Sequence, residues 1–258
     1  MATLIGSVPY LNARPLIKWF ETDEGRASGI EVIEDTPSRL ARMLIEGRLD
    51  AALVSTFASF QRPDFIVLPG ISISGQGEIK SVRAFSRIPF AVIQSVAMDT
   101  SSLTSVALLK ILLAEAYHAH PAPINADPDL TAMLNIADAA LLIGDPGMLA
   151  DGRGLRVLDL GDLWRRHTGL PFTYAVWLCR PDRVSSSLIE ALQVAKEYGL
   201  TQADTIAQEQ AQKLGCSHPM CYDYITEVMD YDLGDEHMEA IATFHRKCRQ
   251  HGLLAQPL

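Results

Sequence analysis

One stretch near the start determines how this chain is organised: Ser7-Val8-Pro9-Tyr10-Leu11-Asn12-Ala13-Arg14-Pro15-Leu16. The apolar run over residues 3–8 predicts a buried first strand, and Pro9 ends it because proline has no N–H for the ladder. Pro15 suits the first turn of a helix, which we expect to reach Phe20. The stretch is therefore a strand-to-helix turn at the carboxyl end of a strand.

Two polar side chains of this turn are candidates for ligand binding. Tyr10 and Asn12 lie at the sheet edge where open α/β folds bind their ligands. The same pattern is also typical of a turn that uses proline and asparagine only for its geometry. A third expected strand, residues 50–54, delivers Ser55 and Thr56 to the same edge.

Apolar strands and helical patterns alternate along the chain, which predicts an α/β fold with mainly parallel sheet. Further strands are expected at residues 30–34, 65–68, 91–96, 139–143 and 173–179. Further helices are expected after the cap at residues 36–38 and at residues 105–117, 186–198, 201–214 and 235–251, the last three closing at Gly199, Gly215 and Gly252. Residues 79–86 and 173–179 are expected to cross between two lobes.

Composition narrows the function classes. The chain has 258 residues, of which 48% are hydrophobic and 21% charged, as in globular proteins. Its first residues lack the pattern of an export signal, and no long apolar run occurs, so we expect a cytoplasmic protein. A net charge of −9 argues against nucleic acid and anionic membranes as partners. Arg14, Lys80 and Arg83 could still supply a local field for a small anion.

Metal and nucleotide cofactors are not expected. The four cysteines show no CxxC spacing, and the segment from Cys216 to Cys221 offers three soft ligands without a fourth. The seven histidines form no HExxH pattern, although His167 could reach a ligand cleft. The chain also lacks a Walker A loop, a GxGxxG turn after a strand and a GxSxG elbow.

A group of hydroxyl side chains marks the start of the helix expected at residues 105–117. With free backbone N–H groups, these side chains could form an anion cradle, although a simple helix N-cap has the same pattern. They are Thr100, Ser101, Ser102, Thr104 and Ser105. After the strand at 139–143, Gly144 would let a ligand approach the backbone, and Asp145 is either a turn former or a cleft carboxylate.

Five segments together resemble the menaquinone biosynthesis enzymes of the futalosine route, in order and in spacing. They are residues 7–16, Glu78-Ile79-Lys80-Ser81-Val82-Arg83, Asp99-Thr100-Ser101-Ser102-Leu103-Thr104-Ser105, Leu142-Ile143-Gly144-Asp145 and Thr168-Gly169-Leu170-Pro171-Phe172. The resemblance implies a two-lobed periplasmic-binding-protein-like fold of type II, with the ligand cleft between the lobes. We expect residues 1–83 plus 178–258 in one lobe and residues 84–177 in the other.

The resemblance also implies an activity, the removal of water from chorismate without a cofactor. It points to Asn12 and Ser81 as the catalytic residues. Since neither is a strong base, we expect the substrate's own enolpyruvyl carboxylate to take the proton. Expected substrate-binding residues are Tyr10, Ser55, Thr56, Ser101, Ser102, Thr104, Gly144 and Asp145.

Two other functions stay open at this point. One is the 1,4-dihydroxy-6-naphthoate synthase activity of the same pathway, and the other is non-catalytic binding of a small anion, since fold alone does not give function. The segment through residues 12–16 is more similar to the dehydrating enzymes. The expected partner is chorismate, and a homodimer is left open.

Overall fold

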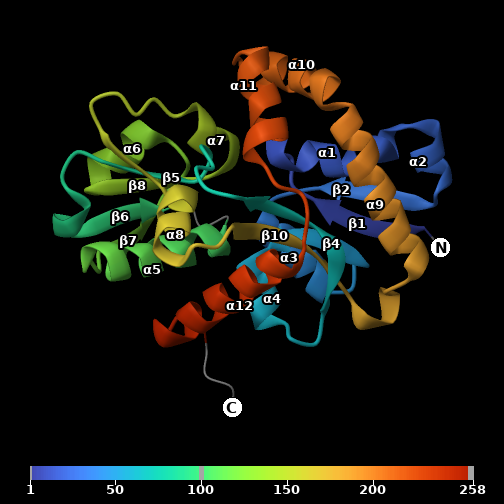
Figure 1. The fold of residues 1–258 in the computed structure, drawn as a ribbon, viewed down its shortest axis with the longest axis horizontal. Coiled ribbons are helices and arrows are strands. Elements are labelled where there is room, and N and C mark those ends of the chain that lie inside the picture. Colours follow the sequence, from blue (N-terminus) through green and yellow to red (C-terminus); the bar gives the residue numbers. More distant parts are fainter. Residues whose placement is uncertain (1, 99–101, 255–258) are drawn as a thin grey trace. The chain divides into compact units, whose positions relative to one another are not determined.

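The computed structural model describes residues 2–98 and 102–254. The chain forms two compact units, and neither is continuous in sequence. Unit 1 consists of Met1–Ser74 and Thr173–Asp235, and unit 2 consists of Gly75–Phe172 and Glu236–Leu258 (Figure 1). The chain therefore passes between the units after Ser74, after Phe172 and after Asp235.

Unit 1 is built on a five-stranded sheet with the order β2-β1-β3-β10-β4. Its strands are β1 (Thr3–Ser7), β2 (Ile30–Glu34), β3 (Ala51–Ser55), β4 (Ile66–Gly75) and β10 (Phe172–Cys179). β1 is parallel to β2 and β3, whereas β10 is antiparallel to β3. Strands β1, β2 and β3 are parallel as predicted, whereas β10 enters from unit 2 and not through a helical crossover within this sheet, so the sheet is mixed.

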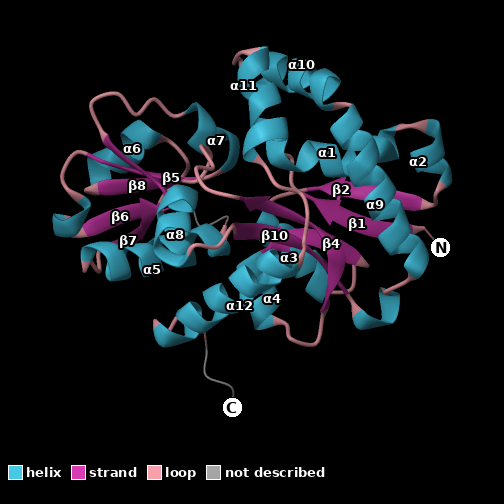
Figure 2. Ribbon diagram, viewed as in Figure 1, coloured by secondary structure: helices cyan, strands magenta, loops and turns pink. Residues whose placement is uncertain are grey.

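Helices accompany this sheet throughout unit 1 (Figure 2). They are η1 (Leu11–Ala13), α1 (Arg14–Ile17), η2 (Lys18–Glu21), α2 (Asp23–Ala27), α3 (Pro37–Ile45), α4 (Thr56–Gln61), η4 (Pro181–Arg183), α9 (Ser186–Thr201), α10 (Ala203–Leu214), α11 (His218–Asp223) and the π-helical η5 (Tyr224–Val228). The single helix expected from about Pro15 to Phe20 is instead two short pieces, α1 and η2, and η1 precedes them. Ile17, with φ of −127°, breaks the α-helical path between α1 and η2.

Unit 2 contains a second mixed sheet, with the order β7-β6-β8-β5-β9. Its strands are β5 (Arg83–Ser86), β6 (Ser95–Met98), β7 (Ala122–Asn125), β8 (Ala139–Leu142) and β9 (Arg156–Asp159), and its helices are η3 (Phe90–Val92), α5 (Leu103–Tyr117), α6 (Leu130–Ile136), α7 (Gly144–Leu149), α8 (Leu160–Thr168) and α12 (Asp235–Gln250). β6 is parallel to β7 and β8, and β5 is antiparallel to β8 and β9. The strand expected at 91–96 begins only at Ser95, where the Asp138 carboxylate accepts hydrogen bonds from two backbone N–H groups.

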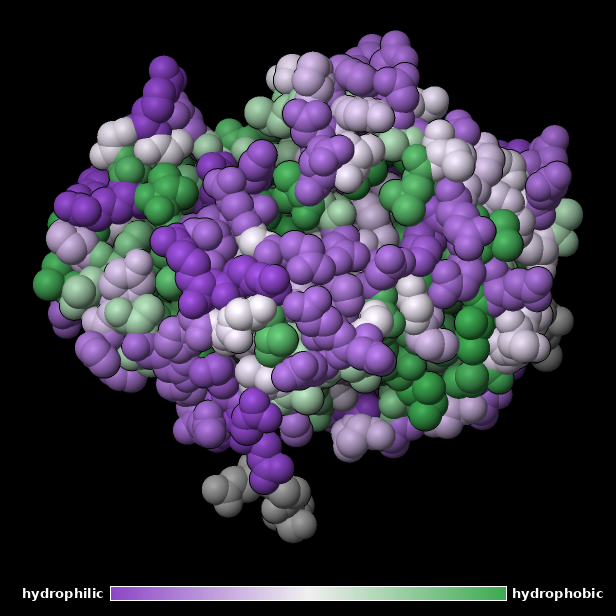
Figure 3. Space-filling model, viewed as in Figure 1, coloured by the Kyte–Doolittle hydropathy of each residue, from purple (hydrophilic) through white to green (hydrophobic). Residues whose placement is uncertain are grey.

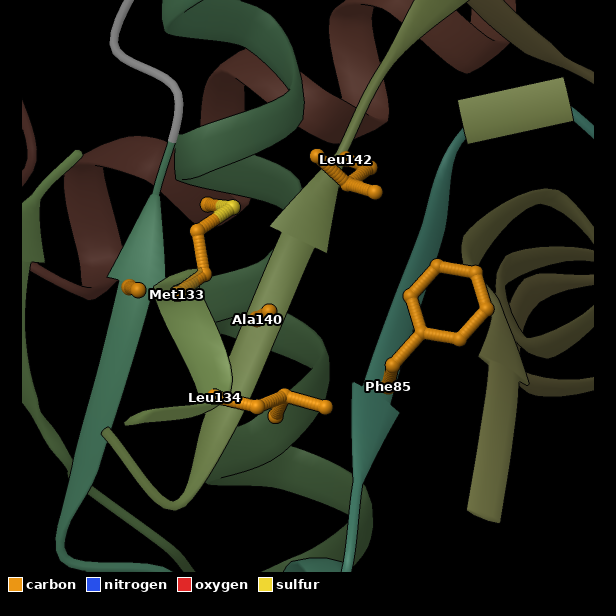
Figure 4. Close-up of a cluster of buried hydrophobic side chains, with 6 residues drawn as sticks. Phe85, Met133, Leu134, Ala140 and Leu142 are labelled. Atoms are coloured by element: carbon orange, nitrogen blue, oxygen red, sulfur yellow. The ribbon is translucent and has the colours of Figure 1, made fainter. Parts of the chain in front are cut away.

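The core of unit 2 joins the sheet to helix α6. Phe85 from β5 and Leu142 from β8 belong to one buried cluster with Met133 and Leu134 from α6 (Figure 4). Small residues, Ala97 on β6 and Ala140 on β8, let these larger side chains pack on the sheet. Unit 2 therefore has its own hydrophobic core between a sheet and a helix, as expected of an α/β fold.

The C-terminal helix α12 belongs to unit 2, whereas the sequence placed residues 236–258 with the first lobe. The reason is aromatic packing: the Phe244 ring lies 5.0 Å from that of Phe172 and 6.1 Å from that of Trp164, centroid to centroid. All three rings are buried. Aromatic pairs at these distances stabilise packing beyond the area they bury.

A carboxylate provides the second attachment of α12. Glu115 on α5 forms an ion pair with Lys247 at 2.6 Å and hydrogen bonds with His167 on α8 at 2.6 Å and His251 at 2.9 Å. Partial burial opposes ionisation, but these hydrogen bonds outweigh it and lower the pKa of Glu115 from 4.5 to about 2. His167 is therefore engaged in holding three helices of unit 2 together.

Gly199 does not end helix α9 as the sequence suggested. The helix continues to Thr201, and Gly199 lies buried within it against α1. A Cβ atom at this position would lie 1.8 Å from the carbonyl oxygen of Pro15. Gly215 and Gly252, by contrast, follow α10 and α12 with φ of 68° and 66°, as predicted for helix ends.

The surface is mixed in character. On the face shown in Figure 3, hydrophilic residues cover much of the surface and hydrophobic residues form separate patches. Within residues 2–98 and 102–254, no helix is both long and apolar enough to span a bilayer.

We predict that Gly199→Ala lowers the free energy of unfolding by at least about 1–3 kcal/mol, the usual cost of overpacking a core. The added methyl group must displace either α1 or α9. Urea unfolding followed by circular dichroism measures the effect. Gly234→Ala is the matched control, because a Cβ at Gly234 meets nothing within 4 Å. Equal stability of the Gly199 variant and the wild type would contradict this packing.

We also predict that Glu115→Gln destabilises the protein at pH 7. Folding lowers the pKa of Glu115 from 4.5 to about 2, so the carboxylate stabilises the fold above pH 4.5 and loses this effect as the pH falls toward 2. The stability difference between variant and wild type should shrink over that interval in urea titrations. Glu239→Gln, at an exposed position of α12, is the control. A pH-independent difference would contradict the role of the charge.

Candidate functional site

The carboxyl ends of β1 and β3 form the candidate edge of unit 1. Because the two strands are parallel neighbours, the turn after Ser7 and the turn after Ser55 lie at the same edge of the sheet. Tyr10 is the N-cap of η1 and has extended backbone geometry, with Asn12 inside η1. Ser55 is the N-cap of α4, and its side chain makes no capping hydrogen bond. The predicted neighbours Tyr10, Asn12, Ser55 and Thr56 thus share one edge.

Asn12 has a buried acceptor without a protein partner. Its Oδ1 atom is buried, and no donor among residues 2–98 and 102–254 reaches it. A buried polar atom left unpaired costs about 1–3 kcal/mol, so such an atom at a ligand-binding edge is well suited to accept a hydrogen bond from a ligand. The amide also carries an N–H₂ donor, which lets Asn12 contact a hydroxyl group from either direction.

Ser7 shares this property and was not singled out from the sequence. Its side chain is fully buried at the end of β1, and its Oγ atom has no hydrogen-bond partner in the described part of the chain. The signal was a polar residue at the end of an otherwise apolar strand. A hydroxyl can donate as well as accept, so Ser7 adds an unused donor to the edge that carries Asn12.

Thr56 is already engaged within unit 1. Its hydroxyl is buried and donates to the carbonyl oxygen of Thr173 at 2.8 Å. The Thr173 hydroxyl in turn accepts from Ser74 at 3.0 Å, and Ser74 contacts Ser72 at 2.7 Å. These buried hydroxyl groups link the start of α4 to β4 and β10. While this bond persists, the Thr56 hydroxyl has no proton to donate to a ligand, and only its oxygen remains as an acceptor.

Ser81 belongs to unit 2 and lies in the irregular segment that connects β4 of unit 1 to β5. The residue is 1% exposed, and its backbone is closely packed against Gly147 of α7. A Cβ atom on Gly147 would lie 2.2 Å from the Ser81 carbonyl oxygen. Only glycine permits this approach, so α7 and the Ser81 segment fix each other's position.

Helix α7 also carries the predicted residues Gly144 and Asp145. Gly144 begins the helix with φ of 59°, a conformation that glycine adopts at little cost. Asp145 lies in the first turn, where the helix dipole favours a negative charge. The turn that the sequence predicts after the strand at 139–143 is therefore the first turn of a short helix.

The structure describes only some of the serine and threonine residues that cluster at the start of α5. Ser102 is the N-cap of α5, and its Oγ accepts a hydrogen bond from the Ser105 backbone N–H at 3.4 Å. Thr104 and Ser105 are buried. Of the residues expected to form an anion cradle, Thr100 and Ser101 lie outside the described residues. For Ser102, the structure shows the N-cap arrangement.

Of the three basic residues expected near the site, Arg14 and Arg83 already bind other groups of the protein. Arg14 is paired with Glu21 and, at 3.2 Å, with Glu34. Arg83 donates from Nε to the carbonyl oxygen of Gly147 at 2.9 Å and also binds carbonyl groups at the end of α7. Burial lowers the pKa of Arg83, an effect that Asp159 and Glu78 oppose. Arg14 is therefore paired with carboxylates of the protein, whereas the carbonyl groups that Arg83 binds are neutral and leave its charge uncompensated. Lys80 is exposed.

The structure identifies no metal-binding cluster in the part of the chain it describes: no group of three or more His, Cys, Asp or Glu side chains there could hold an ion. Cys216 and Cys221 form no disulfide bond with each other, and their Sγ atoms lie 3.3 Å apart. Apart from Asp145, the candidate residues thus provide neutral polar side chains and backbone groups, a donor and acceptor set suited to hydroxyl and carboxylate groups.

Comparison with known proteins adds a family and a fold. A family model described as menaquinone biosynthesis matches residues 3–250. The chorismate dehydratase of Thermus thermophilus is 32% identical over 236 residues, covering 84% of each chain. The chorismate dehydratase of Campylobacter jejuni is 24% identical over 255 residues, covering 95% of this chain and 97% of that one.

The fold is that of periplasmic binding proteins. The periplasmic aliphatic sulphonate binding protein of Escherichia coli superimposes with a TM-score of 0.70 at 16% identity, covering 99% of this chain and 89% of that chain. At this level of identity the likeness concerns the fold alone. The predicted periplasmic-binding-protein-like fold is confirmed.

Proposed function

Because this chain belongs to the menaquinone biosynthesis family, we propose that it is a chorismate dehydratase. The observation that carries the proposal is its 32% identity, over 84% of each chain, to the Thermus thermophilus enzyme of that name. The reaction removes water from chorismate and leaves 3-[(1-carboxyvinyl)oxy]benzoate. This makes the protein a carbon–oxygen lyase. A biosynthetic role with chorismate also supports the expected cytoplasmic location, which stays a prediction.

The reaction breaks two bonds on neighbouring ring carbons. A proton leaves the carbon that carries the enolpyruvyl ether, and hydroxide leaves the carbon beside it, so that the ring becomes aromatic and one water is released. Aromatisation drives the reaction, and the difficulty lies in removing a weakly acidic proton. The enzyme must therefore hold the base, the proton and the leaving hydroxyl in one reactive geometry.

In this proposal Asn12 binds the hydroxyl that leaves. Its buried Oδ1, unpaired among the described residues, accepts a hydrogen bond from the substrate hydroxyl, and its N–H₂ group donates a hydrogen bond to the departing oxygen as the C–O bond breaks. Ser81, held in a closely packed segment, contributes a hydroxyl side chain near the reacting ring. Neither side chain is a strong base, so the enolpyruvyl carboxylate of the substrate accepts the ring proton.

The remaining predicted residues bind the two carboxylates and the ring. We assign the carboxylates to hydroxyl and backbone N–H donors at Ser55, Thr56, Ser101, Ser102 and Thr104, with Tyr10 and Gly144 in contact with the substrate. For Thr56 the donor is the backbone N–H, because its hydroxyl is already used within unit 1. Asp145 carries a negative charge and therefore suits a substrate hydroxyl better than a carboxylate.

We predict that the purified protein converts chorismate to an aromatic product that is lighter by one water, and that treatment with a chelator leaves the rate unchanged. Absorbance and mass spectrometry follow the product. Omission of the protein is the control for spontaneous decay. A protein that leaves chorismate intact over a long incubation would contradict the proposal, and conversion of a larger nucleoside-derived substrate would favour the naphthoate synthase of the same pathway.

We predict that Asn12→Ala and Ser81→Ala each slow the chemical step about ten- to hundredfold, the loss expected for a hydrogen bond to a group that gains charge. Single-turnover experiments with saturating chorismate separate this step from binding. Asn135→Ala and Ser187→Ala, at exposed positions on helices, are the matched controls. Full single-turnover rates in both Asn12 and Ser81 variants would show that the assigned roles are wrong.

A further inference from the structure

The segment that carries Ser81 is held from outside by a single carboxylate. Asp159, the last residue of β9, accepts hydrogen bonds from the backbone N–H groups of Ile79 at 3.0 Å and Lys80 at 2.8 Å. These two residues immediately precede Ser81, and they lie outside any helix or strand. Their N–H groups therefore take part in no helix or sheet hydrogen bonding, and the Asp159 carboxylate supplies their acceptors.

The backbone at Lys80 needs such support. Its φ of 62° is in the left-handed region, which a residue with a side chain adopts only when its surroundings enforce it. The Asp159 Oδ2 atom accepts the N–H of this residue. The strained turn points the chain directly into Ser81, so its geometry determines where the serine lies.

The same carboxylate is also tied to helix α8. Its Oδ1 atom accepts hydrogen bonds from the N–H groups of Gly161 at 3.0 Å and Asp162 at 3.1 Å, which makes Asp159 the N-cap of that helix. The carbonyl oxygen of Val82 accepts a further bond from the Leu160 N–H at 3.1 Å. The Ser81 segment is therefore anchored on both sides of the serine to the start of α8.

We propose that Asp159 is a positioning residue for Ser81: its carboxylate holds the turn at residues 79–80 and so fixes the serine hydroxyl for the reaction. The inference rests on the proposed function, in which Ser81 acts on chorismate. Asp159 itself takes no part in the chemistry. Gly147 bounds the segment from the other side, where a larger residue would strike the Ser81 carbonyl oxygen.

Replacement by asparagine separates the two oxygens of the carboxylate. In Asp159→Asn, the remaining oxygen can still cap α8, but an N–H₂ group replaces the acceptor for Lys80 and faces another donor. In Asp159→Ser, the hydroxyl can still cap α8 but is too short to bind residues 79 and 80 as well. Asp159→Asn therefore loses the bond to Lys80 and keeps that to Ile79, Asp159→Ser loses both bonds, and each variant leaves α8 with a cap.

The test combines steady-state kinetics with a double-mutant cycle. We expect Asp159→Asn and Asp159→Ser to lower kcat at least about tenfold with KM changed less than about twofold. In a Ser81→Ala background, the same replacements should change kcat less than about twofold, because Asp159 acts through Ser81. Asp138→Asn is the matched control, since Asp138 accepts backbone N–H groups of Gln94 and Ser95 at 2.7 and 3.1 Å elsewhere in unit 2; it should leave kcat within about twofold.

Three results would overturn the inference. They are an unchanged kcat in both Asp159 variants, an equal loss in the Ser81→Ala background, and an equal loss in Asp138→Asn. If neither Asp159 variant folds, hydrogen exchange on the wild-type protein decides: Ile79 and Lys80 N–H groups should be protected, and exchange as fast as in an open loop contradicts the inference. A wild-type protein inactive on chorismate contradicts the proposed function instead, and the exchange measurement still tests the turn.

Discussion

Parallel strands end together at one edge of a sheet, and this constraint decides which polar residues of unit 1 can act together. The parallel pairing of β1 with β3 places the turn through Tyr10 and Asn12 beside the one at Ser55. Because the strands themselves are buried and apolar, the polar residues at their ends are the ones left to meet a ligand. The unpaired Oδ1 of Asn12 is the result at the atomic level: the fold presents an acceptor that the protein does not satisfy itself.

Much of unit 1 could be predicted because its signals are local. Strand β2 was expected with its observed bounds, and Gly215 ends α10 as its residue type suggests. Strands β7 and β9 were not predicted, because they lie at the edges of the second sheet and are largely exposed, so they lack a long apolar run. Gly199 was misinterpreted for a different reason: its role depends on Pro15, which is distant in sequence and close only in the folded unit.

In the candidate site, too, local features could be predicted from the sequence and tertiary contacts could not. Asn12, Ser55 and Thr56 follow strands that could be recognised from their apolar residues, so their shared edge was predictable. The occupied state of the Thr56 hydroxyl and the pairing of Arg14 with glutamates depend on tertiary contacts and could not be foreseen. Asp159 is the clearest case, because its hydrogen bonds to residues 79 and 80 join positions far apart in the chain. A single aspartate before a helix carries no sequence signal of that second contact.

The order of segments along the chain also bears on how unit 2 is made. Trp164 and Phe172 pack against Phe244, which lies beyond all of the C-terminal part of unit 1. During synthesis the ribosome must therefore complete the returning segment of unit 1 before the aromatic core of unit 2 can close. Until helix α12 emerges, the nascent chain exposes an apolar surface of the kind that chaperones bind and that promotes aggregation.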